Sequence, residues 1–155
     1  MQKLLSSIKN ILSEPAHSWE ERLKKVCELL QKNQSNYDWV GFYFANFDTQ
    51  MLHLKAFAGT PTEHTAIPFG KGICGQVALS NASLVVPDVQ AEDNYLSCGI
   101  DVRSEIVVPI FVNGKNVGQI DIDSHALDPF KPEDEVFLEE VCKIVADAYP
   151  NNSKP

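Results

Sequence analysis

The stretch of the chain that decides the fold is SEIVVPIFVNGKNVGQIDIDS, residues 104–124. Two runs rich in β-branched and other apolar residues, 105–112 and 116–123, flank the dipeptide Asn113–Gly114. Such runs are typical of strands, and Asn-Gly is typical of the tight turns that join antiparallel strands. The stretch therefore predicts a β-hairpin.

The pairing of the two arms depends on the length of the turn. A strict two-residue turn would set Glu105 opposite Ile122, whereas a three-residue turn that includes Lys115 sets Glu105 opposite Asp123. Because side chains alternate between the faces of a strand, the second pairing leaves one face of the hairpin wholly apolar and gathers the acids on the other. We therefore predict the three-residue turn.

Outside this hairpin, the sequence alternates between helical and strand patterns. Aromatic and β-branched runs around the turn signal 46–49 predict a second hairpin, and two hairpins imply a largely antiparallel sheet with helices packed on it. We predict an α+β fold with five strands. The helices are expected at 4–12, 19–30, 73–79 and 132–145, and the further strands at 39–44, 51–57 and 84–86. Ser18, with Glu21 three residues later, is expected to cap the second helix.

Length and composition limit the class of protein. The 155 residues fit a single domain, which we place at 1–155 with a frayed tail at 150–155. Asp and Glu number 21 against 13 Lys and Arg, and the net charge of −8 argues against nucleic acid or an anionic membrane as a partner. The N-terminus lacks the apolar region of a secretory signal, so we expect a cytoplasmic protein.

Four cysteines fall into two groups. Cys27 and Cys142 lie at apolar positions of predicted helices, where a thiol usually serves as a small buried hydrophobe. Cys74 lies at the start of a predicted helix, where free N–H groups lower a thiol pKa, and Cys98 lies in a polar loop. Each of the latter two is either a reactive thiol or an incidental one. The chain has no Cys-x-x-Cys and no paired histidines, so we expect no metal.

Three acids gather at the end of the first hairpin. Asp121 and Asp123 share one face of their strand, and the preferred register brings Glu105 opposite Asp123. These are either solvated acids at a strand end or a pocket for an ammonium group. Trp39 and Tyr43, four residues apart on one strand face, are either ordinary core aromatics or a wall of that pocket.

Together these motifs resemble the GAF-domain enzymes that reduce free methionine-(R)-sulfoxide. The likeness extends from about residue 39 to the last helix, and the combination of the two cysteines with the acidic strand end is its most specific part. The matching segments are Trp39–Tyr43, Gly70–Gly75, Val86–Val89, Ser104–Pro109 and Gly118–Ser124.

The resemblance implies a GAF fold of about six antiparallel strands with flanking helices, and a thiol mechanism. Cys98 matches the nucleophile that attacks the sulfoxide sulfur and becomes a sulfenic acid; a resolving thiol then forms a disulfide that thioredoxin reduces. The matching pocket residues are Glu105, Asp121 and Asp123, which would hold the substrate ammonium, and the aromatic wall of Trp39 and Tyr43.

Two positions depart from the family pattern. Many members carry a further cysteine ten residues before Cys74, where this chain has His64, so we expect Cys74 to be the resolving thiol. The loop around Cys98 also differs from the usual family sequence. We expect no bound cofactor, thioredoxin as the external reductant and a homodimer, for which the amphipathic N-terminal helix could supply an interface. The alternative is a non-catalytic GAF module that binds a small ligand as a sensor.

Overall fold

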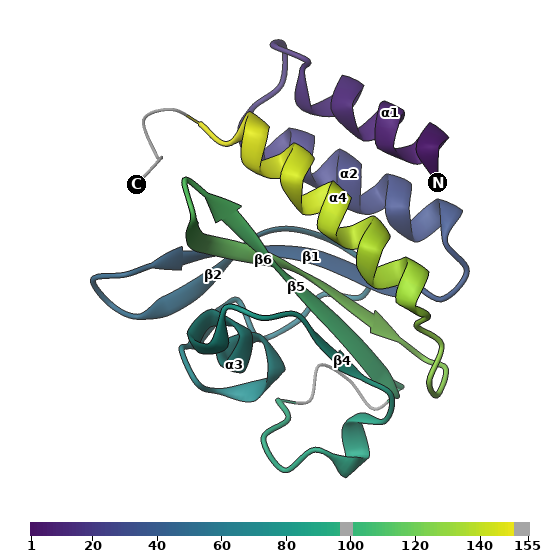
Figure 1. Ribbon diagram of the computed structural model, residues 1–155, viewed down its shortest axis with the longest axis vertical. Coiled ribbons are helices and arrows are strands. Elements are labelled where there is room, and N and C mark those ends of the chain that lie inside the picture. The colour runs from purple at the N-terminus through teal and green to yellow at the C-terminus, as the bar shows by residue number, and fades with distance from the viewer. Residues whose placement is uncertain (97–100, 151–155) are drawn as a thin grey trace.

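The structure, a computed structural model, describes residues 1–96 and 101–150. Six strands form one sheet in the order β3-β2-β1-β6-β5-β4, and the pairing is antiparallel throughout (Figure 1). In chain order the elements are α1 (Gln2–Leu12), α2 (Trp19–Asn33), β1 (Trp39–Asn46), β2 (Met51–Ala58), β3 (Ala66–Pro68), α3 (Gly72–Ser80), β4 (Leu84–Val86), the 3₁₀ turn η1 (Val89–Ala91), β5 (Ser104–Val112), β6 (Lys115–Ser124) and α4 (Pro132–Ala148).

The predicted α+β fold is confirmed, and the count of six strands implied by the resemblance is correct. The residue patterns alone predict five strands because β3 is short and ends in a proline. Pro68 cannot donate a backbone hydrogen bond, so a run that contains it reads as a loop. In the structure β3 is an edge strand that pairs only with β2, and the sheet tolerates a proline there.

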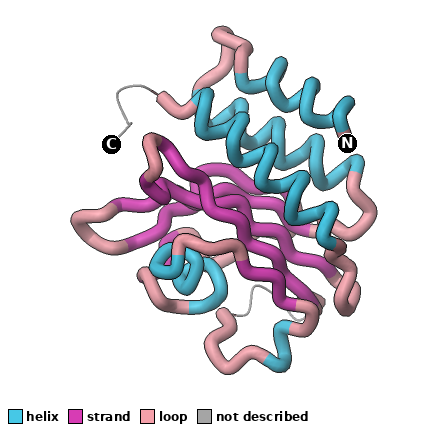
Figure 2. The backbone as a smooth tube through the Cα atoms, viewed as in Figure 1, coloured by secondary structure: helices cyan, strands magenta, loops and turns pink. Residues whose placement is uncertain are grey.

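Helices cover the sheet on both faces. The long helices α1, α2 and α4 lie on one side, and α3 lies on the other with the loops that surround it (Figures 1 and 2). Within 1–96 and 101–150, no helix is long and apolar enough to cross a membrane.

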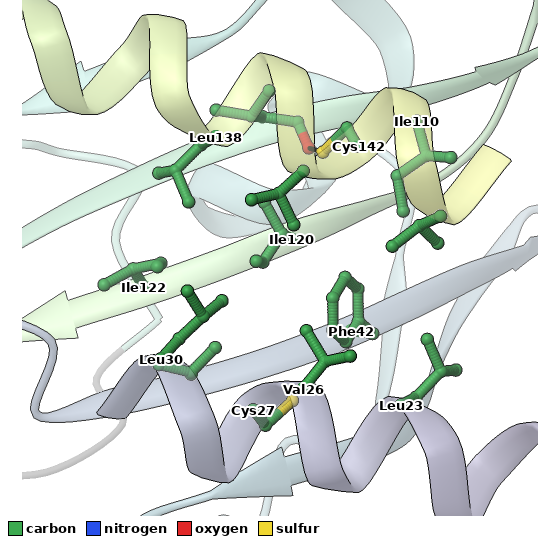
Figure 3. Close-up of a cluster of buried hydrophobic side chains, with 14 of the residues drawn as sticks. Leu23, Val26, Cys27, Leu30, Phe42, Ile110, Ile120, Ile122, Leu138 and Cys142 are labelled. Carbon is green, nitrogen blue, oxygen red and sulfur yellow. Dashed lines mark hydrogen bonds between the residues drawn. The ribbon is translucent and has the colours of Figure 1, made fainter. Parts of the chain in front are cut away.

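The core on the long-helix side is apolar. Leu23 and Leu30 of α2 and Leu138 of α4 are buried against Phe42 and Ile120 of the sheet (Figure 3). The start of α2 is fixed by Ser18, whose Oγ accepts a hydrogen bond from the backbone N–H of Glu21 at 3.2 Å, as the sequence predicts.

The hairpin of β5 and β6 has the predicted pairing but not the predicted turn. Glu105 pairs with Asp123, yet the turn is the two-residue Asn113–Gly114, because Val112 pairs directly with Lys115. The register shifts between Asn116, which pairs with Phe111, and Gly118, which pairs with Ile110. Val117 between them has no partner on β5. This β-bulge, not a longer turn, brings the acids opposite one another.

Candidate active site on the α3 face of the sheet

The three acids of the hairpin are buried on the sheet face that α3 covers. Glu105, Asp121 and Asp123 are 3%, 1% and 1% exposed, so they are not solvated acids at a strand end. Glu105 and Asp123 are direct partners across β5 and β6. Asp123 also pairs on its other side with Trp39 of β1. Three strands therefore bring the acids and the aromatic residue together.

Cys74 lies on α3 directly over these acids. Its Sγ is 3.9 Å from Oε2 of Glu105, and its backbone carbonyl accepts a hydrogen bond from Nε2 of buried Gln119 at 3.1 Å. One ligand atom each of Cys74, Glu105 and Asp121 lies within 4.8 Å of the others. The structure thus gathers a thiol and carboxylates from three separate elements.

The predicted lowering of the Cys74 pKa is wrong. Burial raises the pKa of this thiol well above its ordinary value, and the negative charges of Asp121 and Glu105 raise it further. The helix start offers little compensation, because the N–H of Gly72 already donates to Oδ1 of Asn94 at 2.9 Å. Cys74 is therefore a protonated thiol at neutral pH.

Asp121 and Glu105 are neighbouring buried carboxyl groups, and Glu105 affects the pKa of Asp121. Burial raises the pKa of Asp121, and hydrogen bonds with Glu105 and Cys74 offset part of that shift. A hydrogen bond between two carboxyl groups requires a proton on one of them. Burial therefore favours the protonated form of Asp121, next to Glu105.

Glycines let α3 approach the sheet closely. Gly72 has a φ of +63°, and a Cβ there would lie 2.9 Å from Cγ of Leu96. A Cβ on Gly75 would lie 2.7 Å from the backbone oxygen of Pro68. The glycine-rich motif before and after Cys74 therefore serves backbone packing and places the thiol over the acids.

Trp39 and Tyr43 lie side by side on the same sheet face. Their ring centroids are 6.5 Å apart, and both residues are buried. Their polar ends hold the loop that follows β2: Nε1 of Trp39 donates to the carbonyl of Thr60 at 3.0 Å, and the hydroxyl of Tyr43 donates to the carbonyl of His64 at 2.7 Å. These aromatics therefore fix the position of the loop that contains Thr60 and His64.

A small cavity of about 10 Å³ separates α3 from the acids. This volume is room for about one water molecule. Of the predicted site residues, Cys74, Glu105 and Asp121 line the cavity, whereas Asp123, Trp39 and Tyr43 do not; Cys98 lies outside the described residues. The other lining residues are His64, Ile67, Lys71, Gly72, Ile73 and Leu96.

The sequence analysis does not place Lys71, Leu96 or Gln119 in this site. Lys71 stands in the quoted glycine-rich motif, so its position beside Cys74 was the available signal. Nothing in the pattern around Leu96 or Gln119 indicates the site. A larger groove of about 660 Å³ between α2 and β2 is a poor candidate, since its lining contains no cysteine and no buried acid.

Comparison with known proteins places the chain in a family. The model of the GAF domain matches residues 18–149, so the chain belongs to the GAF family. Its relatives include the free methionine-R-sulfoxide reductase of Escherichia coli, 33% identical over 85% of this chain and 78% of that protein.

Solved structures show the same relationship. A free methionine-R-sulfoxide reductase from Neisseria meningitidis, determined in complex with its substrate, is 33% identical with a TM-score of 0.88, covering 96% of this chain and 87% of that one. A putative GAF sensor protein from Burkholderia vietnamiensis is 30% identical with a TM-score of 0.85, covering 95% and 91%. The chain is therefore similar both to a protein described as a reductase and to one described as a putative sensor.

Proposed function

We propose that this protein is an enzyme that reduces free L-methionine-(R)-sulfoxide to methionine with cysteine thiols. The observation that carries the proposal is the cluster of Cys74, Glu105 and Asp121, buried together under α3 beside Asp123. Relatives named for this activity, at similar length and fold, support it.

The charges around the cavity suit a free amino acid. The carboxylates of Glu105, Asp121 and Asp123 bind the substrate ammonium, and Lys71 at the exposed side of the cavity binds the substrate carboxylate. A methionine sulfoxide within a peptide has neither charge, so these buried acids would lose their partner. An amino acid is larger than the present cavity, so binding separates the side chains that line it.

The chemical steps follow from thiol chemistry. The Cys98 thiolate, its proton released to solvent, attacks the sulfoxide sulfur while a proton shared by Glu105 and Asp121 moves to the sulfoxide oxygen. The hydroxyl then transfers from the methionine sulfur to the Cys98 sulfur as the bond between the two sulfurs breaks, so that methionine leaves and Cys98 is a sulfenic acid. The acid pair regains its proton from solvent. Cys74 then attacks the sulfenic sulfur of Cys98, and the S–O bond breaks as the disulfide forms. The adjacent carboxylates accept the Cys74 proton and pass it to the departing hydroxyl, which leaves as water. Thioredoxin reduces the disulfide and completes the cycle.

Thioredoxin-coupled turnover of free methionine-(R)-sulfoxide tests the activity. We expect turnover with wild type, none with Cys98→Ser, and one methionine per protein without recycling in Cys74→Ser. Cys27→Ala is the matched control, because Cys27 is buried in the other core and should leave turnover unchanged. Full turnover of Cys98→Ser would refute the nucleophile, and recycling of Cys74→Ser by thioredoxin would refute the resolving role.

The second candidate function is a sensor that binds a small ligand. The relative described as a putative sensor supports it. In that case the protein retains methionine sulfoxide unchanged, and mass spectrometry finds no disulfide between Cys74 and Cys98 after substrate is added. A disulfide formed in step with methionine release rejects the sensor.

Two further parts of the proposal concern assembly and location. We propose a cytoplasmic homodimer with α1 at the interface. Sedimentation of wild type and of a chain that lacks residues 1–13 tests the assembly, and a wild-type monomer would refute it.

A further inference from the structure

The cluster of Cys74, Glu105 and Asp121 has the geometry of a metal site as well as a substrate site. In a tetrahedral zinc site, bond lengths of about 2.3 Å to sulfur and about 2.0 Å to oxygen put the ligand atoms roughly 3.5 Å apart. Here Sγ of Cys74 is 3.9 Å from Oε2 of Glu105, and the ligand atoms of all three residues lie within 4.8 Å. Side-chain shifts of roughly 1 Å would complete three corners of a tetrahedron.

An unpartnered oxygen points to a ligand at this place. Oδ1 of Asp121 is buried and has no hydrogen-bond partner among residues 1–96 and 101–150. A buried carboxylate oxygen normally contacts a donor or a cation. Asp121 also lines the cavity of about 10 Å³, which holds one water molecule or one small ion.

The donor set favours a thiophilic cation over Ca²⁺ or Mg²⁺. Ca²⁺ takes six to eight oxygen ligands and Mg²⁺ near-octahedral oxygens, whereas Zn²⁺ takes four ligands drawn from thiolate, imidazole and carboxylate. His64 lines the same cavity but lies outside the group of ligand atoms within 4.8 Å, so its imidazole has to turn toward the ion to fill the fourth corner. Lys71, the lysine at this cavity, is exposed, so solvent screens its charge.

We propose that Cys74, Glu105 and Asp121, with His64 as fourth ligand, bind one Zn²⁺, which competes with the substrate for this site. The binding stands on the geometry alone, whereas the competition rests on the proposed function.

Titration of the reduced, metal-free full chain with Co²⁺ and Zn²⁺ tests the binding. We expect one Co²⁺ per chain with a thiolate-to-cobalt charge-transfer band, displaced by Zn²⁺. The band should persist in Cys98→Ser and in Cys27→Ala and disappear in Cys74→Ser. Asp121→Asn should weaken Zn²⁺ binding at least tenfold. A band that survives Cys74→Ser, or one lost in Cys98→Ser, overturns the site.

Proton release gives a measurement on the unchanged protein, should Cys74→Ser fail to fold. In weak buffer near pH 7, each bound Zn²⁺ should release at least one proton, that of the Cys74 thiol. Binding without proton release contradicts binding by the thiol.

Single-turnover methionine formation by the reduced enzyme, without thioredoxin, tests the competition. Zn²⁺ should raise the substrate concentration needed for half-maximal conversion and leave the saturated rate unchanged. An active enzyme that Zn²⁺ does not inhibit overturns the competition and leaves the function standing. A protein that binds Co²⁺ through Cys74 but forms no methionine retains the metal site while the proposed function fails.

Discussion

Both faces of the sheet bury apolar side chains, but the α3 face buries three carboxyl groups among them. The face under α1, α2 and α4 is an apolar core that includes Cys27 and Cys142, whose pKa values are raised by burial. The face under α3 also buries a cysteine, Cys74, but surrounds it with carboxylates. Burial keeps the thiol protonated on both faces; on the α3 face, carboxyl groups also lie next to the thiol. Stability should depend on the first face and activity on the second.

A substitution that leaves a cavity in the core under α1, α2 and α4 should cause the largest change in the free energy of unfolding and leave activity unaltered. Leu138 of α4 is fully buried in this core (Figure 3), and Leu138→Ala should lower the free energy of unfolding by about 2–5 kcal/mol. Val136, on the same helix, is 61% exposed, so Val136→Ala should change it by less than about 0.5 kcal/mol. Urea denaturation measures both. A large rise in KM of Leu138→Ala under folding conditions would break the separation of the faces.

Asp121→Asn, on the α3 face, should lower activity without lowering stability. Losing one charge from the ammonium site should lower kcat/KM by about 100-fold or more, because a buried charged partner is removed. The variant should nevertheless be more stable than wild type at pH 8, since asparagine has no charge to bury.

The sign of the pH dependence follows from the raised pKa of Asp121. The folded chain binds this proton more tightly than the unfolded chain, whose aspartate pKa is about 3.9. Wild type therefore loses stability as pH rises through the folded-state pKa, and Asp121→Asn does not. Urea denaturation at pH 4 and pH 8 should show the advantage of the variant growing with pH. An advantage that shrinks from pH 4 to pH 8 would contradict the burial of a charge at Asp121.

Displacing the ring of Trp39 should cause the next largest effect, a rise in KM. The ring lies over Gly41, where an added Cβ would come 2.3 Å from Cη2 of Trp39. Gly41→Ala should therefore push the indole out of the wall and raise KM by about tenfold, worth about 1.4 kcal/mol. Trp39→Phe in the Gly41→Ala background removes the clash and should recover part of the loss. A steady-state KM that is the same in Gly41→Ala and wild type would exclude Trp39 from the binding wall.

The sequence predicted the elements of both faces better than their chemistry. Alternation on β6 correctly put Asp121 and Asp123 on one face, and the demand for an apolar opposite face correctly paired Glu105 with Asp123. The turn was wrong because a bulge at Val117 shifts the register equally well, and a pattern of side chains cannot tell where the extra residue lies.

The error about the Cys74 pKa has a different origin. The helix start is local in sequence, but the carboxylates that raise the pKa come from β5 and β6, at Glu105 and Asp121. The folded sheet decides that effect. The roles of the predicted site residues, Cys98 among them, remain predictions for the experiments above.

Substitution of Lys71 should cause the smallest effect, a rise in KM limited to substrates with a free carboxylate. It is exposed at the edge of the cavity, so its attraction for the substrate carboxylate is screened by solvent. Lys71→Ala should raise KM for free methionine sulfoxide about threefold, or roughly 0.6 kcal/mol, with kcat unchanged. Lys32→Ala, at the distant end of α2, is the control and should leave KM unaltered. Methionine sulfoxide amide lacks the carboxylate, so its KM should be the same in Lys71→Ala and wild type. An equal rise in KM for the amide would mean that Lys71 shapes the cavity around Gly72 instead of binding the carboxylate.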